Sequence, residues 1–357
     1  MNSTPLSQNH IRRGARMVDF HGWNMPLLFT NIIEEHKNTR MHAGVFDVSH
    51  MGRLRITGTD AGGLLEKILT RTMKDLKPGR ARYSLLCNEK AGIVDDLIVY
   101  ASSDYYLMVV NASNRENVVA VLDEQRRGMD VTIEDLTLDL AMIALQGPVA
   151  VNILLKLCSP KVAQLKRFAF GSAKVGDTRA LIARTGYTGE DGFEIFVGKD
   201  HVNEVWDRLI DFGAAPTGLG ARDTLRIEAA LPLYGHELGL DTNPFEAGLE
   251  WAVDLEGRNC LGAARMRLIA ADGPIRRVVG LEIDGRKIAR ETMPVLKEMR
   301  RVGAITSGTF SPTLEKSIAL ARVERKFAVE GEELLVDIRG TNVPARVVPI
   351  PFYRRKK

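Results

Sequence analysis

The stretch AGIVDDLIVY, residues 91–100, places two adjacent aspartates, Asp95 and Asp96, in a run that otherwise has the composition of an interior β-strand. Side chains alternate between the two faces of a strand, so the aspartates point to opposite faces. Apolar neighbours on both sides indicate that neither face is fully solvated, and we expect at least one carboxylate to be partly buried. Because burial of an unpaired carboxylate is costly, the fold must supply donors or use the altered proton affinity for chemistry. An ion pair with arginine at a sheet edge is the structural alternative.

Helical and strand patterns alternate on both sides of this run, which predicts a mixed α and β fold. The pattern predicts strands at residues 53–57 and 105–110, and helices at residues 32–40, 118–122 and 201–212. The helix at 118–122 lies between a capping residue, Asn114, and a stop at Gly128. The apolar residues of the helix at 201–212 recur at helical spacing, so we expect that face to be core.

From about residue 276 the pattern changes to short alternating strands, for example at residues 333–338 and 343–348, joined by the turn RGTN. This predicts a small C-terminal β-barrel. Gly and Pro cluster in AADGP, residues 270–274, which favours a linker there. We therefore expect two domains, residues 1–273 and 274–357.

The composition is that of an ordinary globular chain. It has 357 residues, 45% hydrophobic and 26% charged, which excludes disordered and collagen-like classes. A net charge of +4 is small for this length, so charge does not indicate a nucleic-acid binder and fits an anionic ligand or acidic partner. Three widely spaced cysteines, no apolar run of about 20 residues and no hydrophobic signal core predict a cytoplasmic protein without a membrane span.

The histidines do not predict a metal site. The seven histidines show neither an HExxH motif nor paired Cys/His spacing. His36 and His42 are six residues apart, which puts them on different faces of a helix. We therefore expect no metal.

The segment RTGYTGEDGFEIFV, residues 184–197, is richer in polar chemistry than a simple turn requires. Its glycines allow close approach to a ligand, Tyr187 offers a face for stacking, and Glu194 can accept paired N–H groups from a planar heterocycle. The alternative is a hairpin loop whose polar residues are only solvated. The absence of GxxxxGK[ST] and GxGxxG motifs argues against nucleotide hydrolysis.

The segment GLGARDTLRIEAALPLYGHEL, residues 218–238, has helical spacing from 223 to 230, with Gly218 and Gly220 loosening the entry to the helix. A helix start is a natural anion site, and Arg222 there can pair with a carboxylate of ligand or protein. For Arg226 and Glu228, further along, we expect structural pairing.

The segment DVSHMG, residues 47–52, predicts a polar turn with an apolar tip. Ser49 and His50 are adjacent but lack a GxSxG elbow, which disfavours a serine-hydrolase triad.

Taken together, these segments closely resemble the aminomethyltransferase (T protein) family of the glycine cleavage system. The resemblance extends over nearly the whole chain, with the blocks in family order and spacing. The blocks are MVDFHGWNMPL (17–27), GVFDVSHMG (44–52), AGIVDDLIVY (91–100), RTGYTGEDGFEI (184–195), GLGARDTLRIEAALPLYGHEL (218–238) and ITSGTFSPTLEKSIALA (305–321).

The resemblance implies an α+β fold in which two interleaved α+β lobes form a folate-binding domain, followed by a C-terminal β-barrel domain. It implies that an aminomethyl group on the lipoylated H protein is split, with release of ammonia and formation of 5,10-methylenetetrahydrofolate. Tetrahydrofolate is then the one-carbon acceptor and the H protein the partner, with no nucleic acid, membrane or metal involved.

The resemblance also assigns site residues. Asp96 matches the family's functional aspartate near the folate nitrogen that accepts the carbon, with Asp95 as its structural neighbour. Glu194 matches the pterin-binding carboxylate. The remaining matches to the folate site are Tyr83, Asn111, Tyr187, Arg222, Trp251 and Met51. His21, Asn24 and the run Asn259-Cys260-Leu261 depart from the usual family residues.

Two other hypotheses about the function remain open. One is another tetrahydrofolate-dependent demethylase or one-carbon transferase of the same fold. Continuous agreement in AGIVDDLIVY and RTGYTGEDGFEI argues against it. The other is a non-catalytic folate-binding relative, and the presence of Asp96 and Glu194 favours the enzyme instead.

Overall fold

The computed structural model describes residues 1–355, which form two compact units. Unit 1 consists of Met1–Leu64, Lys74–Arg82 and Leu97–Asp223. Unit 2 consists of Leu65–Met73, Tyr83–Asp96 and the chain from Thr224 onward. The chain therefore passes between the units several times, and each unit is described by itself.

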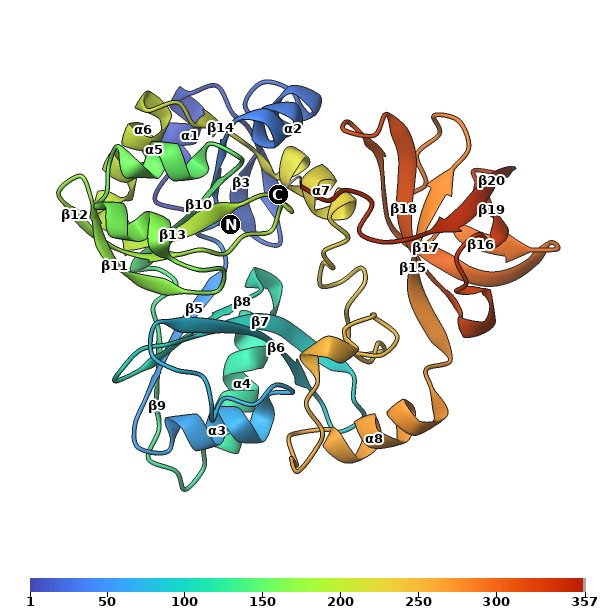
Figure 1. The fold of residues 1–357 in the computed structure, drawn as a ribbon, viewed down its shortest axis with the longest axis horizontal. Coiled ribbons are helices and arrows are strands. Elements are labelled where there is room, and N and C mark those ends of the chain that lie inside the picture. The colour runs from blue at the N-terminus through green and yellow to red at the C-terminus, as the bar shows by residue number, and fades with distance from the viewer. Residues whose placement is uncertain (356–357) are drawn as a thin grey trace. The chain divides into compact units, whose positions relative to one another are not determined.

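Unit 1 contains a small sheet and a larger one (Figure 1). The small sheet has the order β1-β3-β2, with β1 (Asn2–Ser3), β2 (Arg16–Phe20) and β3 (Trp23–Leu28). The larger has the order β11-β12-β13-β10-β4-β14, and only its β14–β4 edge pair is parallel. Its strands are β4 (Gly44–Asp47), β10 (Leu140–Gln146), β11 (Phe170–Val175), β12 (Thr178–Ala183), β13 (Gly192–Gly198) and β14 (Ala215–Pro216).

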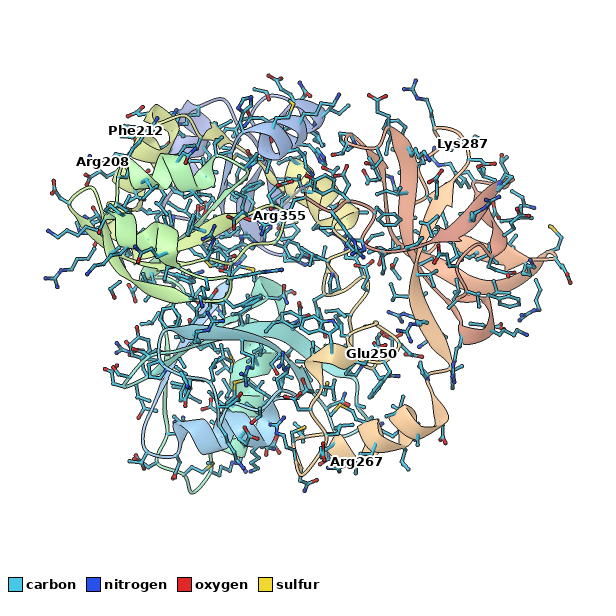
Figure 2. All side chains as sticks on the ribbon, viewed as in Figure 1. Arg208, Phe212, Glu250, Arg267, Lys287 and Arg355 are labelled. Atoms are coloured by element: carbon cyan, nitrogen blue, oxygen red, sulfur yellow. The ribbon has the colours of Figure 1, made fainter. Side chains whose placement is uncertain are left out.

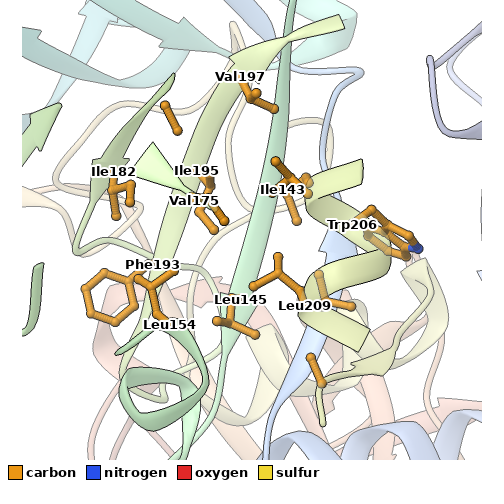
Figure 3. Packing of buried hydrophobic residues seen from close by; sticks show 14 of the residues in the cluster. Ile143, Leu145, Leu154, Val175, Ile182, Phe193, Ile195, Val197, Trp206 and Leu209 are labelled. Carbon is orange, nitrogen blue, oxygen red and sulfur yellow. The ribbon is translucent and has the colours of Figure 1, made fainter. Parts of the chain in front are cut away.

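The core of unit 1 lies between the larger sheet and its helices (Figure 3). Apolar side chains of β10 and β13, such as Ile143 and Ile195, pack with Trp206 and Leu209 of α6 (Val202–Asp211). The predicted core face of this helix is thus confirmed, and Arg208 and Phe212 lie away from that core (Figure 2). The other helices of this part are α1 (Ser7–Arg12), α2 (Ile32–Met41), α5 (Ala150–Leu155), η2 (Pro160–Gln164) and η3 (Lys199–His201). The helix predicted at 32–40 is confirmed as α2.

A third sheet has the order β6-β7-β8-β5-β9, and β6 and β7 each run from one unit into the other. Its strands are β5 (Gly52–Thr57), β6 (Arg80–Cys87), β7 (Ile93–Ala101), β8 (Tyr106–Val110) and β9 (Thr132–Asp135). The helices beside it are α3 (Ala61–Ile68), η1 (Ala112–Asn114) and α4 (Arg115–Gln125). The predicted strands at 53–57 and 105–110 are confirmed as β5 and β8, and the helix at 118–122 as part of α4.

Unit 2 ends in a closed six-stranded barrel with the order β15-β18-β17-β16-β19-β20, which β20 closes by pairing with β15 (Figure 1). The strands are β15 (Arg276–Ile283), β16 (Pro294–Lys297), β17 (Arg300–Ser311), β18 (Lys316–Glu324), β19 (Glu333–Ile338) and β20 (Thr341–Val348), with η5 (Arg325–Phe327) between β18 and β19. Alternating residues such as Leu334, Val336 and Ile338 fill the interior. The expected α+β fold with a C-terminal barrel is confirmed.

Before the barrel, unit 2 contains η4 (Glu250–Ala252) and α8 (Ala263–Asp272), with Glu250 and Arg267 marking these segments in Figure 2. The predicted linker at 270–274 is wrong for its first three residues, which form the last turn of α8. Ala and Asp continue the helix, and Gly273, with φ +80°, ends it.

Candidate functional site

The two aspartates of β7 differ in burial as strand alternation predicts. Asp95 is fully buried, whereas Asp96 is half-buried. Both lie in the part of β7 that belongs to unit 2. The expectation that they face opposite sides, with at least one carboxylate buried, is confirmed. Asp96 is therefore the one of the pair that can meet a ligand while remaining partly desolvated.

Asp96 is supported by an aromatic pair of unit 2. The Tyr83 hydroxyl donates to Asp96 Oδ2 at 3.0 Å, and the Tyr83 ring stacks on Trp251, with centroids 5.3 Å apart. Trp251, on η4, is 57% exposed. This open aromatic stack next to a carboxylate offers a flat ligand a surface to contact. Burial, followed by the charges of Asp95, Asp241 and Asp96, raises the pKa of Tyr234 in the same unit.

Glu194 lies in unit 1 on β13, directly across from Ala144 and Ala183. It is buried, and two hydroxyls donate to the same carboxylate oxygen: Thr185 to Oε2 at 2.5 Å and Tyr100 to Oε2 at 3.2 Å. Burial raises the pKa of Glu194, while the Thr185 bond, the Arg222 charge and the Tyr100 bond act in the opposite direction. None of residues 1–355 bonds to Oε1, so this oxygen remains able to accept from a ligand.

Arg222, at the start of α7 (Leu219–Glu228), carries a positive charge that acts on this carboxylate. Its guanidinium carbon lies 4.7 Å from the Tyr187 ring centroid, within cation–π range. Its Nη1 atom is enclosed and has no hydrogen-bond partner among the described residues. Enclosure lowers the pKa of Arg222, and the Tyr187 and Glu194 charges oppose that shift. Since buried N–H groups are normally bonded, Nη1 is a position for a ligand acceptor.

The loop between β12 and β13 is held by the fold of unit 1. Thr188 donates to the Gln146 side chain at 3.1 Å, and the Gln146 Nε2 donates to the Thr185 carbonyl at 3.1 Å. A Cβ on Gly186 would lie 1.9 Å from Gln146 Oε1, so a larger residue there would displace the Gln146 side chain that holds the loop. The alternative of a loop whose polar residues are only solvated is wrong.

The start of α7 differs from the sequence expectation in two ways. The helix begins at Leu219, four residues before the predicted residue 223, and its glycines allow close packing instead of a loose entry: a Cβ on Gly218 would lie 2.3 Å from Leu27 O. The Gly218 N–H donates to Glu35 Oε2 at 2.8 Å. The predicted anion at this helix start is therefore a carboxylate of the chain itself.

Arg226 and Glu228 have the structural roles that the sequence predicts, within unit 2. Arg226 Nη1 pairs with Glu237 at 2.8 Å, and both residues are buried. Glu228 Oε1 accepts from the Ser311 hydroxyl at 2.5 Å and from the Thr313 amide at 3.1 Å. These contacts anchor the second half of α7 to the barrel.

Two further predicted residues lie at strand ends of unit 1. Met51 is half-buried in the turn between β4 and β5, where the Arg53 guanidinium donates to the Ser49 and Met51 carbonyls. Asn111 is half-buried directly after β8. Its carbonyl accepts from the Asn114 amide at 3.0 Å.

His50 and Ser49 do not form a hydrolase pair. The Ser49 hydroxyl bonds to the main chain of Met142, donating to its carbonyl and accepting from its amide, both at 3.1 Å. His50 is buried with its Nδ1 unbonded among residues 1–355, and burial, together with the Arg222 charge, lowers its pKa to about 3. His50 is therefore neutral at physiological pH.

Sequence reasoning missed Tyr100 and Thr185, the hydroxyls on Glu194. The sequence carries a signal for both: Tyr100 lies near the end of the strand that holds the paired aspartates, and Thr185 lies in the polar segment 184–197. The sequence does not show that both hydroxyls donate to Glu194, because this residue is 94 positions from Tyr100.

Two further findings concern metal-binding clusters and membrane-spanning helices. Within residues 1–355, no three or more His, Cys, Asp and Glu side chains gather as a metal would require. In the same part of the chain, no helix is both long and apolar enough to cross a membrane.

Comparison with known proteins gives consistent matches along the chain. Residues 6–257 match the family model described as GCVT N-terminal domain, and residues 276–354 match the glycine cleavage T-protein C-terminal barrel domain.

Individual relatives match over their full length. Aminomethyltransferase of Desulfitobacterium hafniense (strain DSM 10664 / DCB-2) is 45% identical, covering 100% of this chain and 99% of the relative. Aminomethyltransferase of Geobacillus kaustophilus is 44% identical over all of both chains. The crystal structure of glycine cleavage system aminomethyltransferase T from Bartonella henselae is 34% identical with a TM-score of 0.93, covering 100% of this chain and 99% of that one.

Proposed function

The chain belongs to the glycine cleavage T-protein family, and from this membership we propose which of its residues carry the reaction. It is a tetrahydrofolate-dependent aminomethyltransferase that works with the H protein of the glycine cleavage system.

The aminomethyl group is carried on the lipoyl sulfur of the H protein. Two nitrogen–carbon bonds form on tetrahydrofolate, while the carbon loses its bonds to the lipoyl sulfur and to the amino nitrogen. The two protons that leave the folate nitrogens end on the thiol and on ammonia. The products are 5,10-methylenetetrahydrofolate, ammonia and the dihydrolipoyl H protein.

Asp96 is the group that handles a proton in this exchange. One observation carries the assignment: Asp96 is half-buried, and its Oδ2 accepts the Tyr83 hydroxyl at 3.0 Å. A carboxylate held in this way can accept the proton lost as the folate nitrogen attacks, and it can stabilise a cationic iminium-like intermediate. Asp95, fully buried behind the same strand, is its structural neighbour.

Glu194 binds the pterin through an N–H group, and Arg222 and Tyr187 supply a donor and a ring face. The support for this assignment is the buried carboxylate with a free oxygen, together with the unbonded Nη1 of Arg222. The remaining folate contacts are assigned to Tyr83, Trp251, Met51 and Asn111.

The proposal extends to the setting of the reaction. We place the reaction in the cytoplasm and assign it no nucleic acid, membrane or metal ion. Proton transfer by a carboxylate is the chemistry that Asp96 supplies. The chain divides into a folate-binding domain at residues 1–273 and a barrel domain at residues 274–357.

The experiment is ammonia release from aminomethyl-loaded H protein by the purified chain, with and without tetrahydrofolate. We expect release that depends on tetrahydrofolate, with 5,10-methylenetetrahydrofolate as the folate product. Binding of tetrahydrofolate without release would point instead to a relative that uses folate for another purpose.

A further inference from the structure

The Glu194 carboxylate is held asymmetrically. Both of its side-chain hydrogen bonds reach Oε2, from Thr185 at 2.5 Å and from Tyr100 at 3.2 Å. A carboxylate oxygen offers about two lone-pair sites, so two hydroxyl donors occupy Oε2. The sequence predicts that Glu194 accepts paired N–H groups from a planar heterocycle. In the structure only Oε1 is left for that purpose.

The two hydroxyls are fixed in place by their own surroundings in unit 1. The Tyr100 ring is fully buried, with ring contacts to Phe170 and Phe196 at centroid distances of 5.5 Å each. Thr185 is buried, and its carbonyl accepts from Gln146 Nε2 at 3.1 Å. The two hydroxyls also lie 3.4 Å from each other. If either turned away from Glu194, the buried carboxylate would lose one of its two hydroxyl donors.

We propose that Tyr100 and Thr185 are positioning residues for tetrahydrofolate binding, which occupy Oε2 of Glu194 and thereby present Oε1 as a single acceptor to a ligand N–H. Arg222 Nη1, the enclosed and unbonded donor nearby, is the complementary point for a ligand acceptor. A heterocycle edge with one N–H and one carbonyl oxygen fits this pair. The inference rests on the proposed assignment of Glu194 to the pterin.

Two charged or titratable groups act on Glu194: Tyr100 and Arg222. Tyr187 in turn acts on the charge of Arg222. Burial, and after it the Glu194 charge, raises the pKa of Tyr100 well above its ordinary value, so Tyr100 remains a neutral donor throughout the physiological range. Loss of either hydroxyl removes a bond that stabilises the carboxylate, and the pKa of Glu194 then rises. As the pH falls and Glu194 becomes protonated, folate binding should therefore begin to weaken at a higher pH in such a variant than in the wild type.

The test measures the Kd of tetrahydrofolate by calorimetry for Tyr100→Phe, Thr185→Val and Thr185→Ser across a pH series. Tyr100→Phe keeps the packed ring, and Thr185→Val keeps the shape. We expect each to raise Kd about tenfold at neutral pH and to move the acid limb of binding to higher pH. Thr185→Ser should restore most of the affinity. Tyr106→Phe, another unit 1 tyrosine with no contact to Glu194 among the described residues, is the matched control and should bind like the wild type.

Double variants separate positioning from general loosening of the fold. In a Glu194→Ala background, Tyr100→Phe should change Kd less than twofold, because the acceptor through which it acts is gone. Wild-type Kd and pH profile in Tyr100→Phe and Thr185→Val would overturn the inference, as would an equal loss in both backgrounds. Wild-type affinity in Glu194→Ala alone would remove the pterin assignment first, and this inference with it.

Discussion

Tyr83 donates a hydrogen bond of 3.0 Å to Asp96 Oδ2 while its ring stacks on Trp251. One residue of unit 2 thus connects the half-buried carboxylate to an exposed aromatic surface. The hydroxyl and the ring have separable roles. The hydroxyl orients the carboxylate, and the ring maintains the stack.

Replacement of Tyr83 by Phe should lower the turnover number about tenfold and leave tetrahydrofolate affinity nearly unchanged, since the bond that orients Asp96 is lost while the ring and its stack on Trp251 are kept. The measurement is steady-state ammonia release with separate determination of Kd. In combination with Asp96→Asn, Tyr83→Phe should add no further loss. Fully additive effects would show that the hydroxyl acts independently of Asp96.

Glu35 connects the start of α7 to the segment after β3. Its Oε1 accepts the amides of Phe29 at 2.6 Å and Thr30 at 2.9 Å, and its Oε2 accepts the amide of Gly218 at 2.8 Å. Glu35→Gln turns one acceptor into a donor and should destabilise the fold by about 1–3 kcal/mol in urea unfolding. Glu34→Gln, at the exposed neighbouring position, is the control and should have little effect. Equal stability of both variants would disprove the role of Glu35.

The buried Arg226–Glu237 pair gives a second stability prediction. Arg226→Met leaves the buried Glu237 charge without its partner and should lower the free energy of unfolding by about 3–5 kcal/mol, with partial recovery in the variant that also replaces Glu237 by Leu. Arg300→Met breaks the exposed ion pair with Glu324 in the same unit and should change stability little. If the buried and exposed replacements behaved alike, the structural assignment of Arg226 would be wrong.

His50 predicts a pH dependence of stability. Its pKa is about 3 in the folded chain against an ordinary 6.5, so below pH 6.5 the unfolded chain binds a proton that the folded chain does not. Stability should therefore fall by about 1.4 kcal/mol per pH unit for this group between about pH 6.5 and pH 3. Asp47, with a pKa of about 2 against 3.8, adds a further loss below about pH 4.

The measurement is the urea midpoint between pH 7 and pH 4.5 for the wild type and for His50→Gln. The slope should be shallower in His50→Gln, whereas His201→Gln, at an exposed position, should keep the wild-type slope. A wild-type slope in His50→Gln would contradict the buried neutral state of His50.

Local periodicity was sufficient to predict much of the fold. The two-residue repeat of β7 separates Asp95 from Asp96, and the helical spacing of Val202, Val205, Trp206 and Leu209 identifies the buried face of α6. Both are properties of neighbouring residues. Errors occurred where the boundary depended on context, as at α8, which continues through Asp272 before Gly273 ends it.

The arrangement of the site depended on contacts between distant segments. The resemblance assigned Glu194 to the ligand, but its asymmetric bonding arises only because β7 and β13 bring Tyr100 to it across 94 residues. Likewise, the sequence predicts an anion at the start of α7, and Glu35, 183 residues from Gly218 in sequence, supplies it. Tertiary pairing of this kind leaves no periodic signal in the sequence.

The most direct test of the account is single-turnover ammonia release from aminomethyl-loaded H protein by Asp96→Asn, with tetrahydrofolate present and its Kd measured in parallel. Asp104→Asn, an exposed aspartate just beyond β7, is the control. We predict a loss of about 10² to 10⁴-fold in the rate for Asp96→Asn, a Kd close to that of the wild type and a wild-type rate for the control. An unchanged rate in Asp96→Asn would exclude this carboxylate from the reaction.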